Sequence, residues 1–218
     1  MQLMITCIHT VLIPLAASNL TVRRDMEKAT SVAITRLEEK TNNIMQRTVD
    51  VILNYFAKQL ASQGKHDFRP KDNSLEASML EMLQTPTCQA AVTFLSRAHT
   101  LAVAALSGQN LVSFSTELAR GVLAQLLEHF KKFQVNAAGG LMMTKDLAQY
   151  TATLRGFPAA PQVGSAIDLL PEIGTLFVVG PEALRERLRG AEAVDLKPYV
   201  MRREDVGSVG MQSVLGRL

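Results

Sequence analysis

The feature that most constrains the fold is an uninterrupted helical pattern between residues 22 and 63, a span without Gly or Pro. Apolar or small side chains recur there in steps of three and four residues, with one position skipped at Thr41, which is the spacing of one face of an α-helix. The members of this stripe are Val22, Met26, Ala29, Ala33, Leu37, Ile44, Thr48, Val51 and Tyr55. At 1.5 Å per residue the helix would be about 60 Å long. Compact domains rarely need such a helix, so the pattern predicts a rod or an elongated bundle.

Composition points to the same fold class. Only 5% of the 218 residues are aromatic and Trp is absent, although 47% are hydrophobic, so the core must be aliphatic. Such a composition favours helices over a sheet. We therefore expect an all-α protein, an elongated stack of helical bundles with no sheet. Two cysteines, Cys7 and Cys88, can form neither a disulfide framework nor a four-ligand zinc site, which suggests a reducing compartment.

We expect three regions along the chain. Residues 1–20 begin with seventeen residues that carry no formal charge, and we interpret this stretch as a buried apolar helix at the end of a larger bundle. A signal peptide is the alternative, but the run is too short to span a bilayer. Residues 21–157 form a helical bundle with the long helix first, for which Thr21 is the expected N-cap. Residues 158–218 form a C-terminal helical bundle and tail.

The span from residue 88 to residue 127 contains only three formally charged residues and must be surrounded by protein. Gly108 divides it into two helices, about residues 87–106 and 110–135, which we expect to be the central antiparallel pair of the bundle. Four leucines of this span are expected in the core: Leu106, Leu111, Leu118 and Leu126.

Glycine and proline set the expected ends of the later helices. Gly139 and Gly140 suggest a helix C-terminus, with Thr144 as the N-cap of the next helix. Pro171 is expected to kink a helix over residues 163–179, and Pro181 to begin another one.

No residue pattern of a catalytic, cofactor or metal site occurs in the sequence. The pair His66–Asp67 has no nucleophile motif beside it and is better interpreted as part of a polar loop, with Phe68 packed on the end of the long helix. His99 and His129 have no partner at metal-ligand spacing, so we interpret them as structural histidines. A net charge of +3 is too small for a nucleic-acid-binding surface. The basic pairs are dispersed, so any membrane association is expected to be indirect.

The C-terminal part provides the candidate binding residues. Residues 181–205 contain six basic and six acidic side chains and should be solvated. A balanced charge pattern of this kind can select a protein partner. We predict that Arg185, Arg187 and Arg189 form a partner surface.

An ordered set of short strings resembles the C-terminal region of the exocyst Sec-ten subunit and its fungal relatives, the recyclins. The strings are residues 67–72 (DFRPKD), 108–111 (GQNL), 127–133 (LEHFKKF), 139–141 (GGL), 146–150 (DLAQY) and 176–184 (LFVVGPEAL). No single string is specific, but their order is. The similarity extends from about residue 20 to the end of the chain.

This resemblance implies a rod of stacked helical bundles and a non-catalytic subunit or fragment of an exocyst-like complex, which tethers secretory vesicles to the plasma membrane. It also implies a cytoplasmic location at the vesicle or plasma membrane. The implied partners are other exocyst subunits, with small GTPases of the vesicle as further candidates. Family members are several times longer, so we expect a truncated product or a fragment. The alternatives are a recyclin-type adaptor in endocytic recycling, although the chain has no F-box, and a free-standing helical adaptor.

Overall fold

The computed structural model describes residues 2–16, 18–70, 84–188 and 193–216, and every named element within these ranges is a helix. An isolated bridge joins Val135 to Arg203, and the described residues contain no sheet. The predicted all-α class is therefore confirmed. The chain divides into two compact units, Met1–Thr48 and Val49–Leu218. That the chain is elongated stays a prediction, as do the three regions expected from the sequence.

The first unit is a helical hairpin. Three short helical segments, α1 (Gln2–Cys7), the π-helix η1 (Ile8–Leu12) and α2 (Ile13–Leu15), precede the long helix α3 (Leu20–Ala61), whose first part belongs to this unit. The backbone N–H groups of Thr21 and Val22 donate to Oδ1 of Asn19, at 3.1 and 3.2 Å. Asn19, rather than the expected Thr21, is thus the N-cap of α3. It is the residue directly before the helix begins, and its side-chain oxygen accepts from the first free N–H groups.

Helix α3 has the predicted length, but the predicted apolar stripe is not its core face. In the second unit its buried side chains are Val49, Phe56 and Leu60, whereas Val51 is 67% exposed and Tyr55 is also exposed. Val49 and Val51 lie on opposite sides of the helix because each residue turns the chain by 100°. The helix carries apolar residues on more than one face, so spacing alone did not identify the buried one.

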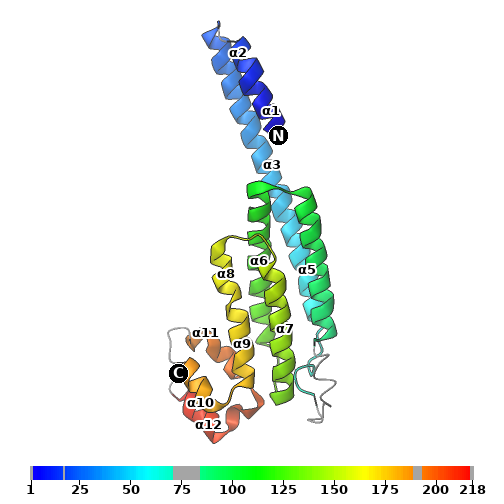
Figure 1. Cartoon of the computed structure of the whole chain (residues 1–218), viewed down its shortest axis with the longest axis vertical. Helices are drawn as coiled ribbons and strands as arrows, with labels where there is room; N and C mark the ends of the chain where they lie inside the picture. Colours follow the sequence, from blue (N-terminus) through cyan, green and yellow to red (C-terminus); the bar gives the residue numbers. More distant parts are fainter. Residues whose placement is uncertain (1, 17, 71–83, 189–192, 217–218) are drawn as a thin grey trace. The chain divides into compact units, whose positions relative to one another are not determined.

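The second unit is built around four longer helices. After the end of α3 come α5 (Pro86–Ala105), α6 (Gly108–Phe130), α7 (Ala137–Arg155) and α9 (Leu169–Val178). Helix α7 packs against both α5 and α9 and lies between them (Figure 1). Leu118 and Leu126 are buried as predicted, whereas Leu106 and Leu111 are only half-buried.

The N-cap of helix α7 lies eight residues before the expected one, Thr144. Asn136 is its N-cap, with Oδ1 accepting from the N–H of Gly139 at 2.8 Å. Gly139 and Gly140 lie inside the first turn instead of ending a helix. A Cβ on Gly139 would stand 1.7 Å from the carbonyl oxygen of Phe68, and one on Gly140 would stand 2.7 Å from that of Phe177. The two glycines are therefore explained by the close approach of other backbone segments.

A buried carboxylate fixes the start of α5. Oδ1 of Asp146, on α7, accepts from the N–H of Thr85 at 2.9 Å, and Oδ2 accepts from the Thr85 hydroxyl at 2.6 Å. The Thr85 hydroxyl oxygen also accepts from the N–H of Cys88, so Thr85 is the N-cap of α5. Burial raises the pKa of Asp146 to about 6, although the hydrogen bonds from Thr85 oppose this shift. The sequence also suggests a short helix over residues 75–83, and this segment lies outside the described residues.

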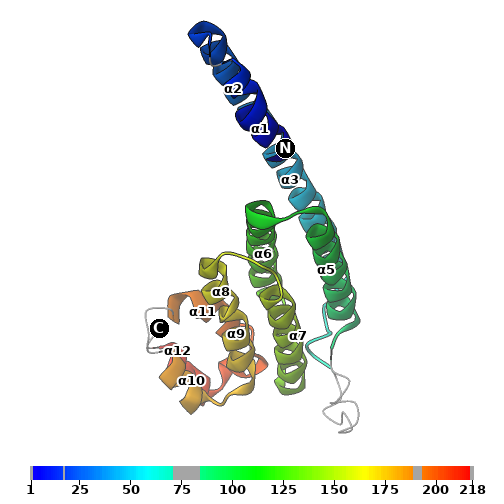
Figure 2. The ribbon, with the colours of Figure 1, turned by 45° about the horizontal axis from the view of Figure 1, so that its top comes forward.

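The C-terminal helices are short and lie beside α9 (Figure 2). Helix α8 (Pro161–Ile167) is separated from α9 at Asp168, so the predicted kink at Pro171 is wrong. Pro171 lies in the first turn of α9, where its missing N–H would have no helical partner. Helices α10 (Pro181–Arg187), α11 (Ala193–Val200) and α12 (Val209–Leu215) follow, with the 3₁₀ turn η2 (Glu204–Gly207) before α12. Helix α10 begins at Pro181 as predicted.

Arg203 holds this end of the unit together. Its buried guanidinium donates to the carbonyl oxygens of Leu176 and Val179 at the end of α9, at 2.6 and 2.7 Å, and to both carboxylate oxygens of Asp205. Hydrogen bonds from the N–H of Val135 to Arg202 and from the N–H of Glu204 to Val135 join the same segment to the start of α7. The last carbonyls of α9 are thus satisfied by a cation, which also suits the negative end of the helix.

Candidate partner surface and basic pocket

The three arginines predicted as a partner surface have different surroundings. Leu184 is buried and anchors α10 to the unit. Nη2 of Arg185 donates to the hydroxyl of Ser213 on α12 at 2.6 Å, and this arginine is half-buried. Arg187 is exposed, whereas Arg189 lies outside the described residues. Residues that are two positions apart in the sequence point about 200° apart around an α-helix, so Arg185 and Arg187 do not share a face. As a partner surface the set stays a prediction.

A second candidate surface is apolar and lies on the first unit. No side chain described between residues 5 and 48 is buried. Several large apolar side chains are 38% exposed or more: Val11, Leu12, Leu15, Leu20, Val22, Val32, Leu37 and Ile44. Large apolar side chains exposed in this number are commonly found where a protein contacts another protein. The stripe recognised in the sequence is thus mostly a surface feature of this unit.

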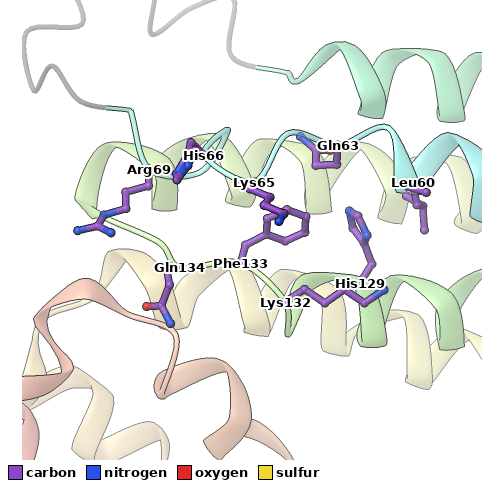
Figure 3. Close-up of a pocket in the computed structure, with 10 residues that line it drawn as sticks. Leu60, Gln63, Lys65, His66, Arg69, His129, Lys132, Phe133 and Gln134 are labelled. Carbon is purple, nitrogen blue, oxygen red and sulfur yellow. The ribbon is translucent and has the colours of Figure 1, made fainter.

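A pocket of about 430 Å³ lies in the second unit, between the end of α3 and the C-terminal end of α6. Lys65, His66 and Arg69 line it from the turns that follow α3, and His129 and Lys132 line it from α6 and the residue pair after it. In Figure 3 the imidazole of His129 projects from α6 toward the end of α3, beside the ring of Phe133. Every formally charged side chain among the lining residues is basic.

His129 is the most deeply buried polar side chain of this pocket. It is 5% exposed, and its ring centroid lies 5.3 Å from that of Phe130 and 4.8 Å from that of Phe133. Burial, together with the charge of Lys132, lowers the pKa of His129 to about 4, so the ring is neutral at pH 7. Its Nε2 atom is buried and has no hydrogen-bond partner among the described residues. The structural role expected for His129 therefore leaves one polar atom unsatisfied.

The nearby acid Asp67 has no ion pair with the pocket lysines recorded among the described residues. Its Oδ2 accepts from Nε2 of Gln63 at 2.5 Å and from the N–H of Gly64 at 2.9 Å. These bonds close the turn after α3 and orient the carboxylate toward that turn. Phe68 is fully buried, as predicted, and its ring lies against those of Phe130 and Phe133. The segment 66–69 is therefore a packed turn.

Sequence reasoning did not find this pocket. Lys65 and Lys132 are 67 positions apart, and each stands in a local sequence typical of a solvated loop or helix end. No local spacing connects them, because the turn after α3 and the end of α6 meet through tertiary contacts such as the packing of Phe68 against Phe130 and Phe133. The sequence predicts His129 to be a structural histidine, but the unpaired state of its Nε2 atom depends on the folded surroundings.

The packed helices and the exposed apolar side chains define a helical-bundle protein with surfaces suited to other proteins. No helix in the described ranges is long and apolar enough to cross a bilayer, and those ranges hold no cluster of three potential metal ligands. The family model described as "Exocyst complex component Sec10-like, alpha-helical bundle" matches residues 1–215. The chain therefore belongs to the Sec10-like family, which confirms the resemblance to the exocyst Sec-ten subunit. The recyclin part of the resemblance is not supported.

Similar proteins come from plants, fungi and animals. The chain is 29% identical over 191 residues to exocyst complex component SEC10a of Arabidopsis thaliana, covering 86% of this chain and 23% of that protein. It is 28% identical over 210 residues to exocyst complex component SEC10 of Saccharomyces cerevisiae, covering 94% and 23%. With exocyst complex component 5 of Homo sapiens the identity is 24% over 191 residues, covering 87% and 26%. The chain thus spans about a quarter of the length of these relatives.

Proposed function

We propose that this chain acts as part of a non-catalytic subunit of an exocyst-like complex that tethers secretory vesicles to the plasma membrane. The observation that supports this most is the family match, which covers residues 1–215. The relatives from Arabidopsis and yeast are named as components of the exocyst complex, and they match across both units of the chain. The proposed location is the cytoplasm, at the membranes where exocytosis occurs.

The proposed direct partners are other exocyst subunits, with small GTPases as further candidates. Exposed apolar side chains on the first unit, such as Leu20 and Ile44, offer the kind of surface that helices of another subunit cover. On the second unit, Arg187 offers a charge that steers the approach of an acidic partner. Membrane association would then be indirect, through the assembled complex.

The test is recovery of named exocyst subunits with the tagged full chain from a cell lysate, measured by immunoblotting. Arg187→Glu should leave the melting temperature nearly unchanged, because exposed charges contribute little to stability, and it is also combined with Arg189→Glu. The same variants should reduce recovery of the subunits, most strongly at low salt, where charge steering is least screened. Arg185→Glu is analysed separately, since it also breaks the bond to Ser213.

Arg120→Glu is the matched control. Arg120 is an exposed arginine of the same unit that pairs only with Glu117, one turn away on the same helix, among the described residues. Its reversal should not change subunit recovery. Failure of the wild-type chain to recover any exocyst subunit would overturn the proposed function. Normal recovery with the Arg187 variants at low salt would instead show that this end of the chain is only solvated.

A further inference from the structure

The basic pocket between α3 and α6 combines several cations with few counter-charges. Lys65, His66 and Arg69 form one wall and Lys132 forms the opposite one, while no acidic side chain lines the pocket. Arg69 pairs with Glu204, with Nη2 2.7 Å from Oε1, and both side chains are about half exposed. Neither Lys65 nor Lys132 has an ion pair recorded among the described residues. Cations gathered in a hollow in this way create a positive potential that attracts anions.

The contrast between two adjacent lysines shows that this arrangement is local. Lys131 has its Nζ atom 2.6 Å from Oε1 of Glu128 and lies over the ring of Tyr199. Lys132, the next residue, faces the pocket instead. Lys131 is thus paired with an acidic residue of the same helix, whereas Lys132 contributes its charge to the pocket.

His129 gives a second and independent indication of a ligand. Buried polar atoms in folded proteins nearly always have a hydrogen-bond partner, and leaving one unpaired costs free energy. Nε2 of His129 has none among the described residues, although the imidazole lies at the wall of a pocket large enough to hold one. A small movement of this ring would let the neutral imidazole donate a hydrogen bond from Nε2 to an oxygen atom of a bound anion.

We propose that this pocket binds a small polyphosphate, either free in solution or as the headgroup of a lipid. Its volume of about 430 Å³ exceeds what one phosphate group fills and lies within the usual range for small-molecule sites. Two lysines without recorded partners on opposite walls fit two phosphate groups better than one, since each ammonium acts as a point charge toward one group. Leu60 and Phe133 add apolar wall for the carbon skeleton between the phosphates.

This site would provide what the sequence did not show. The basic residues are dispersed along the chain, and no run contains the four to eight clustered cations typical of a lipid-binding segment. Folding brings side chains from residues 65–69 and 129–132 to one pocket. The proposal goes beyond the proposed tethering role and does not depend on it.

Isothermal titration calorimetry of the full chain with inositol trisphosphate tests the proposal. We expect saturable binding at one site. Lys65→Gln and Lys132→Gln should each weaken it about tenfold or more, which corresponds to losing one charge-assisted contact. Lys131→Gln, the matched control on the same turn, should change the affinity less than about twofold, since its charge is engaged by Glu128.

His129→Phe separates a binding role from a structural one. If Nε2 of His129 is paired only by a bound ligand, phenylalanine should keep or raise the melting temperature of the ligand-free chain. The same substitution should still weaken trisphosphate binding. A structural histidine would instead lower the melting temperature and leave the affinity unchanged. Such a result, like the absence of saturable binding, would overturn the proposal.

Vesicle sedimentation distinguishes the two sources of the polyphosphate. Phosphatidylcholine vesicles containing phosphatidylinositol bisphosphate should retain the chain if the ligand is a lipid headgroup, and free inositol trisphosphate should compete. Binding of the free trisphosphate without vesicle retention would assign the site to a soluble ligand, and both results support the proposal. Equal weakening by Lys131→Gln and Lys132→Gln, or equally tight binding of a polyglutamate peptide, would overturn it in favour of diffuse charge attraction.

Discussion

Single residues of this chain are constrained by neighbours far away in the sequence. Gly139 and Gly140 illustrate this, because a local interpretation assigns a Gly–Gly pair to the end of a helix. The folded chain uses the missing side chains to bring the backbone of Phe68 and that of Phe177 against α7. By contrast, the burial of Leu118 and Leu126 was predictable, since both lie in an apolar, nearly uncharged local context. The lesson is that apolarity can be inferred locally, whereas close backbone contacts cannot.

Gly139→Ala should strongly destabilise the second unit. The new Cβ would lie 1.7 Å from the carbonyl oxygen of Phe68, so backbone must move, and we expect a loss of about 3 kcal/mol or more. Gly164→Ala is the control, because its Cβ would meet no atom within 4 Å and alanine favours the helix by up to about 1 kcal/mol. Chemical unfolding followed by circular dichroism measures both. A Gly139→Ala protein as stable as the wild type would contradict the close approach.

Two buried titratable groups should give opposite pH dependences. The folded-state pKa of Asp146 is raised from 3.8 to about 6, so on acidification the folded state binds this proton before the unfolded state does. The contribution of Asp146 to the free energy of unfolding therefore falls as the pH rises from about 4 to 6. The pKa of His129 is lowered from 6.5 to about 4, so its contribution is lost as pH falls through the same window. In the wild type the two effects, each of about 3 kcal/mol, largely cancel.

Substituting either Asp146 or His129 should reveal the pH dependence of stability that the other group causes. Asp146→Asn should make the free energy of unfolding decrease on acidification from pH 6.5 to 4, relative to the wild type. His129→Gln should make it increase over the same range. Urea unfolding at several pH values gives these slopes, and all other titrating groups are common to the three proteins. Parallel pH profiles for the wild type and both variants would show that neither pKa is shifted in the folded chain.

At the scale of elements, the sequence predicted the long helices well and the short ones less well. Helices α3, α5 and α6 begin and end within a few residues of the expected positions, because long periodic patterns dominate their sequences. The break between α8 and α9 was missed, since both helices are apolar and the turn at Asp168 contains no glycine or proline. The buried face of α3 was also missed, because the helix has apolar residues on several faces.

Leu118→Ala and Leu126→Ala test whether α6 is a core element. Both side chains are almost fully buried, so each substitution should cost about 2 to 5 kcal/mol through lost burial and a cavity. Leu101→Ala on α5 is the control, since this leucine is 63% exposed and should cost less than about 0.5 kcal/mol. Denaturant titration gives the three values. If the two core variants unfold at the same denaturant concentration as the Leu101 variant, α6 is not buried in solution.

At the scale of the whole molecule, the first unit is expected to govern association. Its described side chains form no buried core, while Leu15, Leu20 and Ile44 are each exposed by about two thirds or more. Exposed apolar surface promotes self-association in the absence of a partner. Size-exclusion chromatography with light scattering should therefore show a mass that rises with the concentration of the full chain.

Replacing these three residues by Gln should reduce this self-association without lowering helicity. The matched control replaces Leu101, Val103 and Val209, three exposed apolar residues of the second unit, and should leave the association unchanged. A wild-type chain that stays monomeric over the whole concentration range would show that the first unit covers its own apolar side chains in solution.

Arg203 has a consequence for the timing of folding during synthesis. The second unit is completed by contacts from residues 203–204 back to Arg69, Val135, Leu176 and Val179. The ribosome adds roughly 5 to 20 residues per second, so the end of α9 exists for a second or more before its carbonyl groups can receive this guanidinium. We expect ribosome-bound chains that stop before Arg203 to be cleaved rapidly by a protease, and chains extended beyond Leu215 with a linker to resist it. The second unit would thus reach its final packing only after its C-terminal residues have been translated.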